Sequence, residues 1–118
     1  MIDELASRCF ATRDAAHREH WATSSLAVHQ ALGDFYKALP DAIDTMVECY
    51  QGQYELIGMF AVKLEEKDTD IIKLLRDDVD WMQAVRVEIT NDDPTLLNLL
   101  DAIVALYQQT LYRITRLS

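Results

Sequence analysis

The sequence predicts an all-α protein folded as a four-helix bundle, and three observations support this prediction. Half of the 118 residues are hydrophobic, which is enough for a core without disulfide or metal cross-links. Only three glycines and two prolines occur, so the chain has few of the turns that a sheet protein requires. Apolar residues instead recur at helical intervals in four long stretches. We expect residues 1–118 to form a single domain.

The first predicted helix covers residues 2–21. Cys9 and Ala16 lie on its apolar face at helical spacing, and His20 falls on the same face. The polar run at residues 22–25 predicts a turn, and a serine in that run can serve as the N-cap of the next helix.

The second predicted helix covers residues 26–51 and ends at Gly52. Pro40 lies inside it, where a proline can bend the helix or begin a new one. Because the apolar stripe keeps its phase across Pro40, we predict one kinked helix. The stripe consists of Leu32, Tyr36, Leu39, Ile43, Val47 and Tyr50.

The third predicted helix covers residues 69–88, and the fourth begins at Pro94. Proline suits the first turn of a helix, and Asp93 before it can act as the N-cap. Between the second and third helices, residues 53–67 are apolar enough to form either a short helix or a crossover packed on the bundle.

The charge of the chain argues against binding to nucleic acid. The sequence holds 20 acidic and 11 basic side chains, a net charge of −9, and the basic residues form no cluster. A surface of this kind offers few contacts to phosphates, so we expect no binding to duplex DNA.

Several features predict a cytoplasmic protein. The first residues, MIDELASR, are acidic and amphipathic, unlike a signal peptide. No apolar run approaches the roughly 20 residues that a membrane-spanning helix needs. Cys9 and Cys49 are isolated and match no zinc or redox spacing, so we expect two reduced thiols.

Three groups of residues are candidates for chemistry. His20 lies with the apolar side chains, where a histidine is as often a hydrogen-bonded core residue as a ligand. Asp44 and Glu48 are four residues apart and so project from the same side of a helix, although this spacing alone favours a solvated acidic face. Asp78 falls on an apolar face and needs a partner such as an arginine, a histidine, a tyrosine or a metal ion. Structural pairing is the interpretation that we favour for Asp78.

The segment from His20 to Gly52 contains a characteristic series of residues: His20-Trp21, His29, Phe35, Leu39, Asp44-Thr45-Met46 and Glu48. In these elements it resembles part of the Dps-type mini-ferritins, and also a small ferritin-like family found in phage genomes. The resemblance implies a ferritin-like bundle, whose connectivity requires a long crossover between the second and third helices. It also implies that His20, His29, Asp44 and Glu48 are ligands of an iron site with ferroxidase activity. The family usually has an aspartate where this chain has Gly33.

The spacing of these residues bears on how such a site is built. His29 and Asp44 are 15 residues apart, which is roughly 22 Å along a continuous helix. One chain therefore cannot bring both to one metal ion, whereas two antiparallel copies related by a two-fold axis near Tyr36 and Lys37 can. We predict a homodimer, or a multiple of dimers, that binds iron at its interface, with zinc as the other metal that this ligand mixture suits. The alternative is a non-enzymatic, phage-type helical interaction or sequestering module without a metal site.

Overall fold

The computed structural model covers residues 1–118 and contains five helices and no strand. The elements, in chain order, are α1 (Ile2–Ala22), α2 (Leu26–Gln53), α3 (Ile71–Ala84), α4 (Arg86–Thr90) and α5 (Pro94–Arg116). The all-α class is therefore confirmed. None of the helices combines the length and apolar character needed to cross a membrane.

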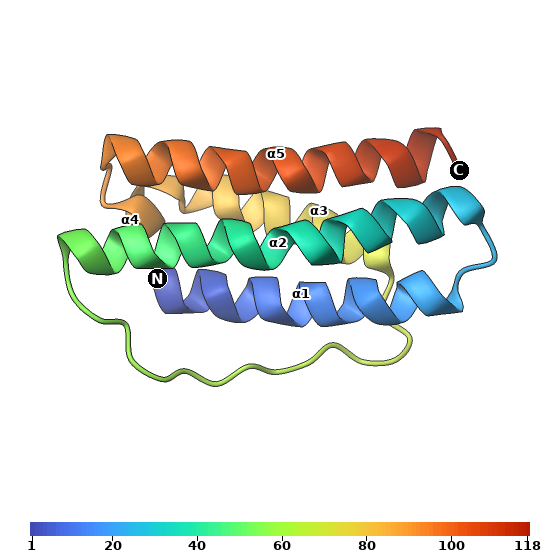
Figure 1. The fold of residues 1–118 in the computed structure, drawn as a ribbon, viewed down its shortest axis with the longest axis horizontal. Coiled ribbons are helices and arrows are strands. Elements are labelled where there is room, and N and C mark those ends of the chain that lie inside the picture. The colour runs from blue at the N-terminus through green and yellow to red at the C-terminus, as the bar shows by residue number, and fades with distance from the viewer.

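The four longer helices lie side by side along the long axis of the molecule (Figure 1). Helix α1 contacts α2 and α3, and α5 also contacts α2 and α3, so each longer helix has two neighbours. Helices α1 and α5 run in one direction, and α2 and α3 run in the other (Figure 1). Because α2 and α3 are parallel, the chain must return along the whole molecule between them.

Residues 54–70 make this return beside α1, as an extended segment without a helix (Figure 1). The sequence left open whether this segment forms a short helix or a crossover, and the structure shows the crossover. Gly58 has a φ of 73°, a left-handed conformation that interrupts any regular repeat there. Two large apolar side chains of the crossover face outward, since Leu56 is 80% exposed and Met59 is 99% exposed.

The second helix continues through Pro40, as predicted. A proline has no N–H to donate to the carbonyl four residues earlier, which is that of Tyr36. Arg13 on α1 supplies the missing donor, because its Nε lies 3.3 Å from the Tyr36 carbonyl oxygen. The side chain of a neighbouring helix thus stabilises α2 at its weakest point.

The third predicted helix, residues 69–88, differs from the structure at both ends. Helix α3 begins at Ile71, after the N-cap Asp70. The helix was expected to extend to residue 88, but α3 ends at Ala84 and a short helix, α4, follows Val85. The break falls in a stretch where β-branched residues are frequent, and such residues lose side-chain freedom in a helix. They are Val85, Val87, Ile89 and Thr90.

Aspartate and serine caps define the starts of three helices. Ser25 accepts a hydrogen bond from the Val28 N–H, Asp70 caps α3, and Asp93 caps α5 ahead of Pro94. The helices pack around one apolar core. The largest fully buried side chains are Leu5, Leu32, Phe35, Leu39, Ile43, Met46, Leu75, Met82, Ile89, Leu96, Leu100 and Tyr107.

Candidate functional site

His20 and His29 lie in contact where α1 ends and α2 begins. Their rings are stacked, with centroids 3.7 Å apart and planes inclined by 15°. The Nδ1 atom of His20 lies 2.5 Å from the carbonyl oxygen of His29, and the Nδ1 atom of His29 lies 2.6 Å from the carbonyl oxygen of His20. The two histidines therefore hold each other in place, across a turn of only three residues, Thr23–Ser25.

These contacts determine the protonation pattern of the two rings. A carbonyl oxygen can only accept a hydrogen bond, so each Nδ1 must be the donor. In a neutral imidazole the other nitrogen, Nε2, then keeps its lone pair. Metal-binding histidines commonly have this arrangement, in which one nitrogen donates to a carbonyl and the other binds the metal. Both rings line an open polar hollow of about 360 Å³.

Three more ring side chains, those of His17, Trp21 and Tyr36, support the histidine pair. The ring of His17 stacks on Tyr36, with centroids 3.9 Å apart, and Trp21 lies 4.6 Å from the His17 ring. Tyr36 also meets the edge of the His20 ring at 5.3 Å. The seam between α1 and α2 is thus a chain of contacting rings that fixes the orientation of His20.

Gly33 leaves the space that the His20 ring occupies. A Cβ atom added at Gly33 would lie 2.9 Å from Cε1 of His20 and 3.2 Å from its Nδ1. Any larger residue at this position would therefore displace the ring or be displaced by it. The glycine that departs from the mini-ferritin pattern is thus matched to the position of His20.

Asp44 and Glu48 lie elsewhere on α2 and are both exposed. They border a small hollow of about 140 Å³ between α1, α2 and the crossover. Apolar side chains make up the rest of its wall: Ala6, Phe10, Ile43, Val47, Ile57 and Phe60.

A single chain does not bring the four predicted ligands together. His20 and His29 line one hollow, and Asp44 and Glu48 line the other. No group of three or more histidine, cysteine, aspartate or glutamate side chains in the chain is arranged to hold a metal ion. This outcome agrees with the separation expected along α2, and it means that any four-ligand site requires a second copy.

Residues 20–114 match the model of a family whose description reads "Family of unknown function (DUF5856)". The chain belongs to the DUF5856 family. The matched range begins at His20 and includes His29, Asp44 and Glu48. No protein of curated function and no solved structure matches the chain.

The DUF5856 chain has a second polar feature, a buried cluster around Asp78 on α3. The Asp78 side chain is 4% exposed, and its Oδ2 accepts hydrogen bonds from Thr12 Oγ1 at 2.5 Å and from the Tyr107 hydroxyl at 2.9 Å. Arg8, whose guanidinium stacks over the ring of Trp81, lies 3.6 Å from Oδ1. The predicted structural pairing of Asp78 is therefore confirmed, with tyrosine and arginine among its partners.

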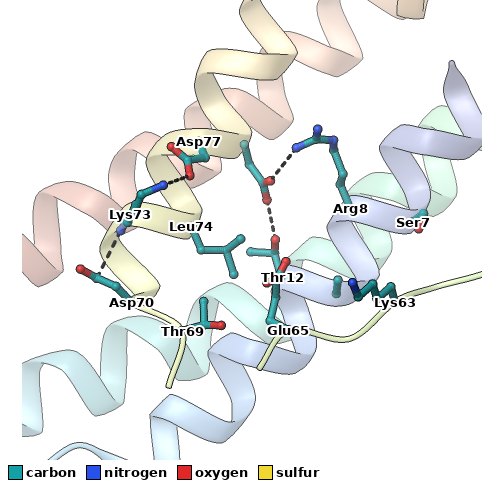
Figure 2. Close-up of a pocket in the computed structure, with 12 residues that line it drawn as sticks. Ser7, Arg8, Thr12, Lys63, Glu65, Thr69, Asp70, Lys73, Leu74 and Asp77 are labelled. Atoms are coloured by element: carbon teal, nitrogen blue, oxygen red, sulfur yellow. Dashed lines mark hydrogen bonds and ion pairs between the residues drawn. The ribbon is translucent and has the colours of Figure 1, made fainter. Parts of the chain in front are cut away.

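Asp78 is one of the residues that line a polar cavity of about 580 Å³ between α1, α3 and the crossover. Figure 2 shows this cavity, with Arg8 and Thr12 of α1 on one side and Lys73 and Asp77 of α3 on the other. The crossover is tied to α1 here by two hydrogen bonds, from Ser7 Oγ to the carbonyl of Ala61 and from Arg18 to the carbonyl of Glu65. On the rim, Lys73 and Asp77 pair with each other and not with Asp78.

Burial shifts the acidity of this cluster. Loss of hydration raises the pKa of the Asp78 carboxyl above its ordinary value of 3.8, against the effect of the two hydroxyl donors. Burial likewise raises the pKa of Tyr107, and it raises the pKa of the Cys9 thiol to about 12. A thiol with that pKa is almost wholly protonated at neutral pH, so Cys9 is a core residue and not a nucleophile.

Sequence reasoning did not find Gly33, His17 or Tyr36 as parts of the site. The spacing of residues along the sequence shows which of them share a face of one helix. It does not show contacts between α1 and α2, and these three residues act through such contacts. One signal was present: a glycine inside a strongly helical stretch costs about 1 kcal/mol relative to alanine and so suggests a steric requirement.

Proposed function

We propose that this chain forms a ferritin-like four-helix bundle that binds iron at a two-fold interface between two copies. In this proposal His20 and His29 of one copy and Asp44 and Glu48 of the other are the ligands. The observation that carries it is the histidine pair, in which both Nδ1 atoms are engaged by carbonyls and both Nε2 atoms are free for a metal.

The charges on the seam between α1 and α2 support self-association. The hollow at the histidine end contains His20 and His29, together with Lys37 and with Arg113 paired to Asp34, while the hollow at the other end contains the carboxylates of Asp44 and Glu48. A two-fold axis between the two hollows places the histidines of each copy against the carboxylates of the other, and does so twice.

The ligand set suits a divalent ion of borderline softness, such as Fe²⁺ or Zn²⁺. Two imidazole nitrogens and two carboxylates leave room for a further molecule on the ion. With Fe²⁺ as the substrate, each ion would lose one electron to dioxygen, and the carboxylates would stabilise the added positive charge. The protein's own role is to hold the four ligands and to relieve the repulsion between Asp44 and Glu48 by means of the cation.

The proposal is tested by titrating the untagged protein with Fe²⁺ under anaerobic conditions and then following dioxygen consumption. We expect about one site per chain and loss of both signals in Asp44→Ala, with the helical signal and the dimeric mass retained. Asp41→Ala, an exposed neighbour on the same helix, is the control and should keep both signals. A wild-type mass of 13.5 kDa by light scattering would contradict the shared site.

The second candidate is a helical interaction module without metal. The feature that favours it is Gly33, which supplies no ligand where the mini-ferritins usually have an aspartate. Under this function the protein would bind neither Fe²⁺ nor Zn²⁺, and Asp44→Ala would behave as the wild type in every assay.

A further inference from the structure

Trp21 is the most exposed aromatic side chain of the protein, at 71%. Its ring contacts that of His17, and the rest of it faces solvent. Tryptophan is one of the residue types enriched among the side chains that dominate binding energy at protein interfaces. An indole in this position is therefore available for a contact that a single chain does not make.

The hollow beside Asp44 and Glu48 is the counterpart of this indole. Six apolar residues line it, including Phe10, Ile57 and Phe60, and the rings of Phe10 and Phe60 lie 5.9 Å apart. It combines an aromatic wall with an acidic rim. An indole suits both, because its ring is apolar and its Nε1–H can donate to a carboxylate.

The contacts between α1 and α2 show how far Trp21 and the hollow at Phe10 each lie from Tyr36 along the helix axis. Arg13 and His17 both contact Tyr36, so the level of Tyr36 on α1 falls between them, near residue 15. Trp21 is six residues beyond this level and Phe10 is five residues before it, about 9 Å and about 8 Å along the helix. A two-fold axis at Tyr36 therefore brings Trp21 of one copy to the level of Phe10 of the other.

We propose that Trp21 of each copy inserts into the hollow formed by Phe10, Val47, Ile57 and Phe60 of a second copy of this chain. The inference rests on the proposed dimer and adds the contact that sets its register. The charge pattern supports the same occupant, since the histidines next to Trp21 then meet the acidic rim of the hollow. The tryptophan is an anchor, and it is distinct from the metal ligands.

The test uses the metal-free protein, so that anchoring and metal binding are measured separately. Trp81→Phe leaves Trp21 as the sole tryptophan of the chain. In that background, we expect the emission maximum to shift to shorter wavelength with rising concentration, at the same concentration at which light scattering reports dimers. Trp21→Ala should weaken dimerisation by about 30-fold or more, the effect of a dominant interface residue.

Two further variants separate the anchor from general surface effects. Ile57→Glu places a charge inside the hollow that receives Trp21 of the second copy, and it should weaken dimerisation as Trp21→Ala does. Tyr112→Ala removes an aromatic residue that is also exposed, but on α5, and should have no effect.

The outcomes distinguish this inference from the proposed function. A Trp21→Ala protein that dimerises as the wild type and still binds Fe²⁺ would overturn the anchor and leave the shared metal site standing. A wild-type protein that is monomeric at all concentrations, both without metal and with Fe²⁺, would overturn the proposed function itself. Dimers that are lost with both Trp21→Ala and Ile57→Glu, and kept with Tyr112→Ala, would support the anchor.

Discussion

The Nδ1 atom of His20 lies 2.5 Å from the carbonyl oxygen of His29, and the reciprocal contact from His29 to His20 measures 2.6 Å. Two residues nine positions apart thus form a closed unit across the turn between α1 and α2. The unit leaves one nitrogen of each ring without a protein partner, on the rim of an open hollow.

Gly33→Ala should displace the His20 ring. The new Cβ would lie 2.9 Å from Cε1 of His20, so either the ring or the helix backbone must move. We expect a loss of metal affinity of at least tenfold and a destabilisation of about 1–2 kcal/mol, typical of a crowded core position. Isothermal titration with Zn²⁺ and thermal unfolding measure the two effects.

Gly52→Ala is the matched control, because Gly52 lies in the same helix and a Cβ there would meet nothing within 4 Å. It should stabilise the protein by up to about 1 kcal/mol, the helix-propensity gain of alanine over glycine, without changing metal affinity. Equal effects of the two substitutions on affinity would show that Gly33 has no steric role.

Asp78→Asn should change the pH dependence of stability. Burial raises the pKa of the Asp78 carboxyl, so above its ordinary value of 3.8 the folded chain binds more protons than the unfolded chain. The stability of the wild type therefore gains from Asp78 at low pH and loses that gain as pH rises through the raised pKa. The amide keeps an acceptor for Thr12 and Tyr107 without this dependence. We expect the melting temperature of Asp78→Asn, relative to the wild type, to increase from about pH 4 to about pH 7.

Asp77→Asn is the control for this series. Asp77 is adjacent to Asp78 but exposed, and it pairs with Lys73 on the surface. Surface ion pairs contribute about 0–1 kcal/mol, so the variant should follow the wild type closely at each pH. If Asp78→Asn also runs parallel to the wild type, Asp78 does not titrate as burial requires.

The two cysteines should differ sharply in reactivity. Cys49 is exposed, whereas Cys9 is buried and has a pKa raised to about 12. A thiol reagent should therefore label one cysteine per native chain at neutral pH and the second only after unfolding. Cys49→Ser should abolish the native labelling. Rapid labelling of both thiols in the native protein would mean that the part of the core around Cys9 on α1 is readily exposed to solvent.

Duplex DNA should not bind this protein at physiological salt. The net charge of −9 leaves few cationic side chains to displace counterions from phosphates. The hollow that contains Lys37 and Arg113 does not alter this expectation, because Arg113 is already paired with Asp34 at 2.8 Å. A sub-micromolar mobility shift at about 150 mM salt would show that a basic surface has been overlooked.

The helices were predictable from the sequence where local rules decide them. Serine and aspartate caps and a continuous apolar stripe place the starts of α2 and α5, and the stripe carries α2 through Pro40. The break at Val85 was not predictable, because it falls in a stretch that keeps its apolar period. The conformation of the crossover was left open, since a short apolar run fits a helix or an extended segment equally well.

The sequence predicted the candidate ligand residues of the site, but it did not predict how they contact one another. The resemblance identified His20 and His29, but the reciprocal carbonyl contacts depend on the turn between α1 and α2. Gly33 looked like a missing ligand in the sequence, and in the structure it is the space for a ring. Asp78 was predictable as a paired residue, because a buried charge on an apolar face requires a partner. Its partners come from α1 and α5, which no local spacing reveals.

The central claim is that each metal site takes histidines from one copy and carboxylates from the other. It is tested by mixing two inactive variants, His29→Ala and Asp44→Ala, after joint unfolding and refolding. Each variant alone should bind no Fe²⁺ tightly. In the mixture, half of the dimers are hybrids, and each hybrid has one intact site and one site lacking both ligands, so about a quarter of the wild-type sites should return. Binding that stays absent in a mixture shown by mass spectrometry to contain hybrid dimers, or that persists in either variant alone, would contradict the shared site.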